Sequence, residues 1–138
     1  FFPPTAADQQ IINHGRLSGL AAKASLNPGT AVEVVGKQSG TRILQVGGLA
    51  VTYRLRDDNN IQYCFEQLFE LRWPRFARVV FGRPVQRGDS GGWVLQSTAT
   101  GTEWAGMVVA GDRLIGYAEF SENVTAWAQS AHNLSLTV

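Results

Sequence analysis

From residue 31 to residue 120 the sequence repeats one pattern, a short apolar run followed by a turn rich in Gly, Asn or Asp. Several of these runs alternate apolar and polar residues, a period that is typical of half-buried β-strands. The predicted strands cover residues 31–35, 41–55 with a bend at Gly47-Gly48, 61–71, 76–81, 93–96, 104–110 and 114–120. Such strands, joined by polar turns, predict an all-β fold, a single antiparallel barrel of six to seven strands.

Residues 1–30 have a different pattern and predict an arm in front of this domain. Thr5-Ala6-Ala7-Asp8 has the shape of a capping box with Asp in place of Glu, which predicts a short helix running through Ile12. Asn13-His14-Gly15 would end that helix, because glycine is the usual C-terminal cap. We therefore divide the chain into an arm or linker with a short helix over residues 1–30 and one domain over residues 31–138.

The end of the sequence predicts a second helix. Its apolar residues recur at the spacing of one helical face, and they are Val124, Trp127, Ala128 and Ala131. Ser121 stands where a capping side chain is expected. We therefore expect a terminal helix that packs this face against the strands.

The composition excludes several classes of partner and cofactor. With 138 residues and a net charge of +1, the chain has no electrostatic case for binding nucleic acid or an anionic membrane. No apolar run is long enough to span a bilayer, and the start Phe1-Phe2-Pro3-Pro4 lacks a signal peptide's charged beginning and resembles a cut end. One Cys and two His cannot build a tetrahedral metal site, and no phosphate loop is present, so we expect neither metal nor cofactor.

Two further features concern cysteine and arginine. Cys64 lies between Tyr63 and Phe65 in an alternating segment, and we expect it to be a buried structural thiol. Arginines cluster at mixed spacing, which favours solvated flanks or a local anion contact over a phosphate track; they are Arg72, Arg75, Arg78, Arg83 and Arg87.

The stretch Gly88-Asp89-Ser90-Gly91-Gly92 lies between two apolar runs and predicts a tight turn with one hydroxyl at its tip. Glycines on both sides of the serine allow positive φ and close approach of a second chain. Backbone amides in such a turn can point into one concavity, as an oxyanion hole requires. Ser90 is therefore a candidate nucleophile; the alternative is a turn serine that bonds backbone.

This motif is followed by Trp93-Val94-Leu95, then Gly106–Gly111, then Gly116-Tyr117 and a terminal helix containing Trp127. The ordered set resembles the C-terminal half of a trypsin/chymotrypsin-like serine peptidase. The resemblance implies a chymotrypsin-like barrel, with Ser90 as nucleophile, the amides of Gly88 and Ser90 as oxyanion donors, and Asp89 supporting the turn. Secreted members usually carry several disulfides, so the single cysteine favours an intracellular protein, or a bacterial one without disulfides.

The resemblance also implies a substrate pocket and a polypeptide substrate. The walls of this pocket would be formed by the residues just before the serine and by the strand after it, namely Pro84, Val109, Ala110, Gly111 and Gly116. Members that cleave after basic residues carry an acid where this chain has Pro84, so no basic preference is expected. An uncharged, apolar or small side chain is predicted instead.

The serine motif does not supply the general base that would accept the Ser90 proton, nor the acid that would orient this base. In the resembled family they come from a first barrel, which this sequence does not contain. The candidates within the chain are His14 with Asp57 or Asp58, which keep the family's order, although His14 lacks the family's small-residue flank. Asp57 and Asp58 also lie in the predicted hairpin turn 57–60.

Three hypotheses follow. The chain is the serine half of an endopeptidase that needs an amino-terminal barrel or second fragment, a peptidase-like module that binds peptides without catalysis, or a compact peptidase that uses His14. The first predicts that the isolated chain is inactive or nearly so. It also predicts an apolar face left exposed, with Phe1, Phe2, Trp73 or Phe76 as candidates.

Overall fold

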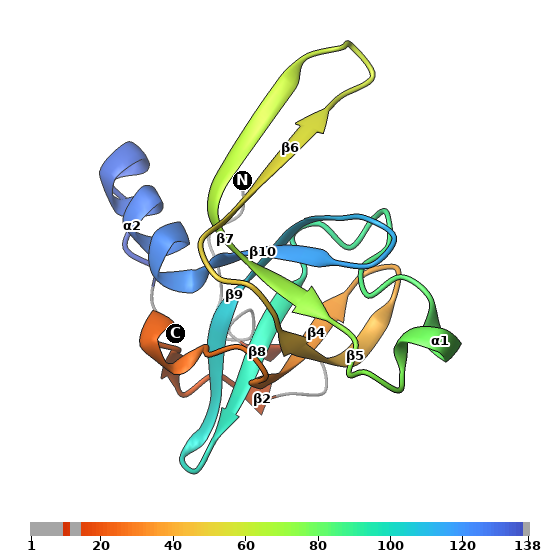
Figure 1. Cartoon of the computed structure of the whole chain (residues 1–138). Helices are drawn as coiled ribbons and strands as arrows, with labels where there is room; N and C mark the ends of the chain where they lie inside the picture. Colours follow the sequence, from red (N-terminus) through yellow and green to blue (C-terminus); the bar gives the residue numbers. More distant parts are fainter. Residues whose placement is uncertain (1–9, 12–14, 137–138) are drawn as a thin grey trace.

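The computed structural model describes residues 10–11 and 15–136. Its strands are β1 (Gln10–Ile11), β2 (Gly15–Arg16), β3 (Gly19–Leu20), β4 (Ala31–Gly36), β5 (Gly40–Val46), β6 (Val51–Arg56), β7 (Gln62–Arg72), β8 (Trp93–Thr98), β9 (Gly101–Gly111) and β10 (Gly116–Phe120). Its helices are the short 3₁₀ helix η2 (Lys23–Ser25), α1 (Arg78–Phe81) and α2 (Ser121–His132). The fold is thus mostly β, with α2 packed against β9 and β10 (Figure 1).

Within the described residues, six strands close a ring in the order β10-β7-β5-β4-β8-β9 and back to β10. Every neighbouring pair in the ring is antiparallel, which confirms that part of the prediction. Strand β3 joins β9 in parallel, so the complete sheet is mixed. Strand β8 lies beside β4 after a long connection from β7, an arrangement with Greek-key order. That connection, residues 73–92, contains the serine turn.

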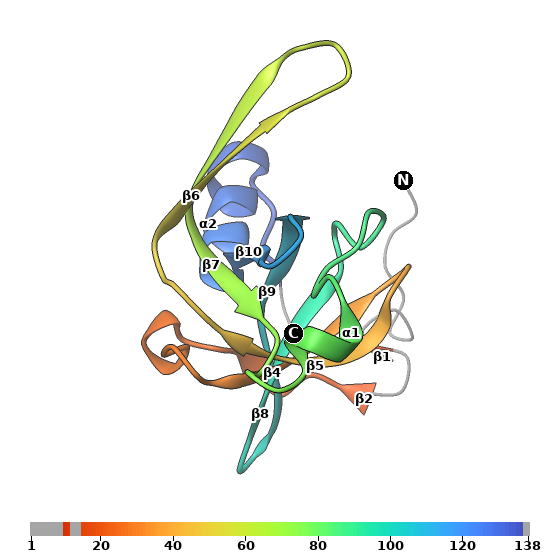
Figure 2. The same ribbon diagram turned by 45° about the vertical axis from the view of Figure 1, so that its right-hand side comes forward.

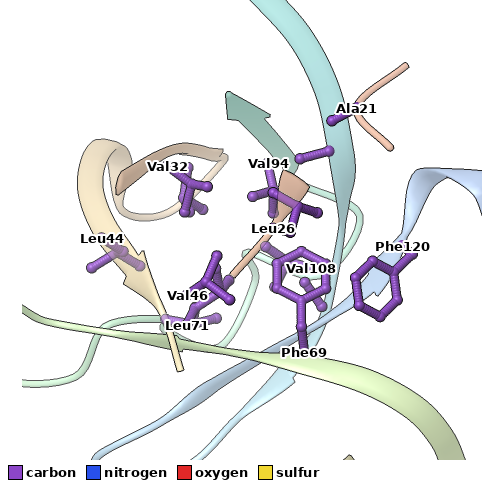
Figure 3. Packing of buried hydrophobic residues seen from close by; sticks show 14 residues of the cluster. Ala21, Leu26, Val32, Leu44, Val46, Phe69, Leu71, Val94, Val108 and Phe120 are labelled. Atoms are coloured by element: carbon purple, nitrogen blue, oxygen red, sulfur yellow. The ribbon is translucent and has the colours of Figure 1, made fainter. Parts of the chain in front are cut away.

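The core lies inside the ring, where alternate side chains of the strands meet. On β4 the residues Val32 and Val34 are buried while their neighbours are less so, as the alternation in the sequence predicts. Both belong to the core cluster, and Figure 3 shows Val32 among the other core side chains, which include Leu44, Val46, Phe69, Leu71, Val94, Val108 and Phe120. The rings of Phe69 and Phe120 are 4.7 Å apart. The core therefore joins the strands of the ring into one unit.

The predicted arm contributes to this core. Ala21 and Leu26 are buried in it, and β3 extends the sheet next to β9. The predicted helix over residues 5–12 lies mostly outside the described residues. Its two described residues, Gln10–Ile11, form strand β1, which pairs with β2. At these two positions the helix prediction is wrong, because strand pairing satisfies the backbone instead.

The predicted continuous strand over residues 41–55 is two strands, β5 and β6, of which only β5 belongs to the ring. Strand β5 ends before Gly47-Gly48 and the bend itself falls at residues 49–50; among the described strands, β6 then pairs only with β7 and leaves the ring. Positive φ angles at Ala50 and Gln67 (54° and 61°) accompany the register shift at the root of this hairpin. Figures 1 and 2 show the hairpin projecting from the body. Its tip is the predicted turn, closed by the Asp57 amide donating to the Ile61 carbonyl at 3.0 Å.

The strand prediction for residues 76–81 is wrong. This segment forms a turn followed by α1, and three of its apolar side chains face solvent: Phe76 is 94% exposed, Val80 74% and Phe81 59%. None of the described strands pairs with this segment. An apolar run without a pairing partner does not become a strand.

Three predictions about single side chains also fail. Cys64 is exposed, because the hairpin that carries it projects into solvent. Ser121 is the first residue of α2 rather than its cap, and its hydroxyl is buried without a hydrogen bond to another described residue. On the predicted apolar face of α2, Ala128 is buried but Trp127 is 60% exposed and contacts His132 edge to face.

Candidate functional site

The serine turn is held against β9 by backbone hydrogen bonds. The Gly91 amide donates to the Val108 carbonyl at 2.8 Å, and the Val108 amide donates to the Gly92 carbonyl at 2.9 Å. Gly88 and Gly91 have φ angles of 99° and 84°, which an L side chain rarely adopts. Glycine on both sides of the serine is thus required by the backbone, as expected.

The Asp89 carboxylate fixes this turn to the β4–β5 hairpin. It is 2% exposed, and its Oδ1 accepts the amides of Gln38 and Ser39, each at 2.9 Å. Its Oδ2 accepts the Gln86 amide at 2.9 Å and the Ser39 hydroxyl. Burial alone would raise the pKa of Asp89, but these four hydrogen bonds outweigh it and lower the pKa below 3.8. The side chain is therefore a buried anion held by local donors.

Ser90 is exposed at the tip of the turn, outside the packed core. Its hydroxyl donates a hydrogen bond to the Val109 carbonyl at 3.0 Å. The acceptor is therefore a backbone group of strand β9 and not one of the serine turn itself. Neither the Gly88 nor the Ser90 amide donates a hydrogen bond to another described residue. Two backbone donors beside the hydroxyl are thus available to a ligand.

A cleft of about 440 Å³ brings most of the predicted site residues together. Those that line it are Gly88, Ser90, Val109, Ala110, Gly111, Asp57 and Asp58. The two aspartates reach it from the tip of the β6–β7 hairpin. The Asp57 carboxylate is engaged in the turn, where Oδ1 accepts the amides of Asn59 (2.9 Å) and Ile61 (2.8 Å). Asp57 is therefore committed to holding the hairpin tip.

Two predicted wall residues do not line the cleft. Pro84 is buried, and its carbonyl accepts the Arg42 guanidinium at 3.1 Å. Gly116 is covered by Val85: a Cβ added at Gly116 would lie 2.5 Å from Val85 Cγ2, and one added at Gly111 would lie 3.1 Å from Val85 Cβ. Val85 therefore fills the space that the two glycines leave. The sequence reasoning missed this residue, whose only signal was its place next to Pro84.

No histidine of the described residues lines the cleft. His132 lies at the end of α2, and His14 falls outside the described part of the chain. Among the residues that the structure describes, no group of three or more His, Cys, Asp or Glu side chains is placed to hold a metal ion. No described helix combines the length and apolar character needed to cross a membrane.

An exposed apolar patch lies on the connection between β7 and the serine turn. It consists of Trp73, Phe76, Val80 and Phe81, with the Trp73 and Phe81 rings 5.2 Å apart. Trp73 is half-buried under the Arg42 guanidinium, which lies 5.5 Å from its ring. Of the residues predicted to be exposed, Phe76 is the most open, and Phe1 and Phe2 lie outside the described residues.

No family model matches the chain, and no curated protein sequence is significantly similar to it. Inferences about function therefore depend on the cleft itself.

Proposed function

We propose that the chain is the serine-bearing half of a chymotrypsin-like endopeptidase. The observation that carries this proposal is the juxtaposition of an exposed Ser90 hydroxyl with two unbonded amides, those of Gly88 and Ser90, at the wall of a cleft. The six-stranded ring with Greek-key order supports a barrel of the chymotrypsin type. The buried Asp89 network supports a turn whose amides are positioned before the substrate arrives.

In this proposal the Ser90 oxygen attacks the carbonyl carbon of a peptide bond, and its proton passes to a histidine outside the described residues. The negative charge on the carbonyl oxygen is stabilised by the amides of Gly88 and Ser90. Collapse of the tetrahedral intermediate breaks the C–N bond, the histidine protonates the leaving amine, and an acyl-enzyme remains. Water then attacks the ester carbonyl, the histidine accepts the water's proton, and return of a proton to Ser90 releases the acid product.

The cleft also supports the binding of an extended polypeptide. Of the described strands, only β10 pairs with Val109–Gly111, so the other edge of this segment has no strand partner, although the Val109 carbonyl already accepts the Ser90 hydroxyl. A substrate chain can add to that edge as a further strand. Because Val85 fills the space next to Gly111 and Gly116, the adjoining subsite suits a small uncharged side chain.

No histidine of the described residues lines the cleft, so a base is sought in a partner. We propose that an amino-terminal barrel, or a separate fragment of the same protein, supplies histidine and aspartate. The patch of Trp73, Phe76, Val80 and Phe81 is a candidate contact for it, because exposed apolar patches mark interaction sites.

A second candidate function is a peptide-binding module without catalysis. The hydrogen bond from Ser90 to the Val109 carbonyl favours it, because the hydroxyl then serves to hold the turn on β9. Such a module would use the same open edge of β9 without chemistry at Ser90.

Labelling with a fluorescent fluorophosphonate separates these functions. The peptidase proposal expects Ser90 to be labelled only when the amino-terminal partner is added. Ser90→Ala should abolish this labelling, while Ser97→Ala, at an exposed serine of β8, should not. Labelling of the isolated chain that is lost in His14→Gln supports the compact peptidase. Absence of labelling in every context, with peptide still bound, supports the binding module and refutes the peptidase.

A further inference from the structure

The β6–β7 hairpin forms a second wall of the cleft, opposite the serine turn. Tyr53 and Leu55 of β6 line the cleft together with Ser90 and Val109. Beyond its root the hairpin has no other strand partner among the described residues, and it projects from the ring (Figures 1 and 2). The Tyr53 ring contacts the ring of Tyr117 on β10 at a centroid distance of 4.4 Å. This contact places the base of the hairpin over the body of the protein.

The two faces of the hairpin differ in chemistry. The register pairs Tyr53 with Phe65 and Leu55 with Tyr63, so these four side chains share one face. Arg54 pairs with Cys64 on the opposite face. Tyr53 and Leu55 of the apolar face line the cleft, whereas Arg54 and Cys64 do not. Leu55 is nevertheless 40% exposed, so this wall has apolar surface left to cover.

The charged groups of the cleft favour an acidic occupant. Three arginines line it, Arg56, Arg83 and Arg87, together with two aspartates, Asp57 and Asp58. The Asp57 carboxylate accepts two amides of its own turn, so its charge is already partly satisfied. Arg87, next to Gly88, makes no hydrogen bond or ion pair with another described residue. Its guanidinium is therefore available to a carboxylate of a ligand.

We propose that the cleft clamps an extended polypeptide segment between the open edge of β9 and the apolar face of the hairpin, and that Arg87 pairs with an acidic side chain of that segment. The inference rests on the proposed function only for the class of ligand, a polypeptide. The open strand edge provides main-chain hydrogen bonds, while Leu55 and Tyr53 cover an apolar side chain from the other side. The hairpin thereby acts as a specificity-determining arm.

The test uses the Ser90→Ala chain, which cannot react, and an array of octapeptides that samples all twenty residues at every position. We expect the peptides that bind to combine apolar residues with Asp or Glu. Replacing the acidic residue of a bound peptide with its amide should weaken binding about two- to fivefold, the range for an exposed ion pair. Arg87→Gln should remove this difference, while Arg54→Gln on the opposite face of the hairpin should keep it.

The hairpin is tested by a second pair of variants. Leu55→Ser should weaken binding about three- to eightfold. The bound peptide would bury the exposed part of the Leu55 side chain, and the serine variant loses this apolar surface. Cys64→Ser, on the opposite face, should leave the Kd unchanged, and both variants should keep the melting temperature of the parent. No binding across the array, a preference for basic peptides, or equal effects of Leu55→Ser and Cys64→Ser would overturn the proposal. Peptide binding without any fluorophosphonate labelling would refute the peptidase function and leave this inference standing. Labelling of Ser90 without the expected effects of Arg87→Gln and Leu55→Ser on peptide binding would support the peptidase function and refute this inference.

Discussion

Replacement of Asp89 by Asn tests whether the buried carboxylate holds the serine turn in place. In the wild type, Oδ1 accepts the amides of Gln38 and Ser39 while Oδ2 accepts the Gln86 amide and the Ser39 hydroxyl. Asparagine keeps one acceptor oxygen but turns a donor NH₂ towards the Gln86 amide. The buried Gln86 amide then lacks an acceptor, and the remaining hydrogen bonds are no longer strengthened by a negative charge on the acceptor. We expect the free energy of unfolding to fall by about 2–4 kcal/mol.

The assay is urea unfolding followed by tryptophan fluorescence, with Asp58→Asn as the matched control. Asp58 is exposed at the hairpin tip, so its replacement should change the unfolding free energy by less than about 0.5 kcal/mol. Equal effects of the two substitutions would refute the proposed role of Asp89.

The same residue predicts a dependence on pH. Because the pKa of Asp89 lies below its unfolded value of 3.8, its stabilisation is complete above pH 3.8 and is lost as pH falls through the folded pKa. Asp89→Asn should therefore be less sensitive to acid below pH 3.8 than the wild type is. An unchanged acid-unfolding profile would contradict this reasoning.

Three further predictions concern the cleft, the core and strand β10. Val85→Gly should open the filled subsite and, with the amino-terminal partner present, raise kcat/KM for large apolar side chains relative to small ones; an unchanged ratio would argue against Val85 as the filling residue. Gly106→Ala should lower the unfolding free energy by about 1–3 kcal/mol in urea, because the added Cβ would collide with the Glu119 backbone carbonyl and lie 2.9 Å from the Phe69 ring. The Tyr117 phenol should titrate near pH 12 by ultraviolet absorbance, because burial first and the Asp112 charge second raise its pKa to about 12. Asp112→Asn should lower that pKa towards 10, and titration near 10 in the wild type would contradict the burial argument.

Local signals in the sequence were sufficient to predict several structural elements correctly. The alternation of Val32 and Val34 predicted a half-buried strand, and the polar run Asp57–Asn60 predicted the hairpin tip. The glycines around Ser90 predicted positive φ angles, which the serine turn has. Each of these features depends on residues a few positions apart, so period and turn chemistry reveal it directly.

The remaining features required contacts between distant segments. Phe76 lies in an apolar run that looks like a strand, but no described strand pairs with that run. Cys64 alternates like a buried residue, yet its hairpin leaves the ring. Val85 fills the space beside Gly111 and Gly116 only because the connection that carries the serine turn packs against these glycines of β9 and β10. Periodicity states which residues share a face, whereas the pairing of strands far apart in the chain decides what that face meets.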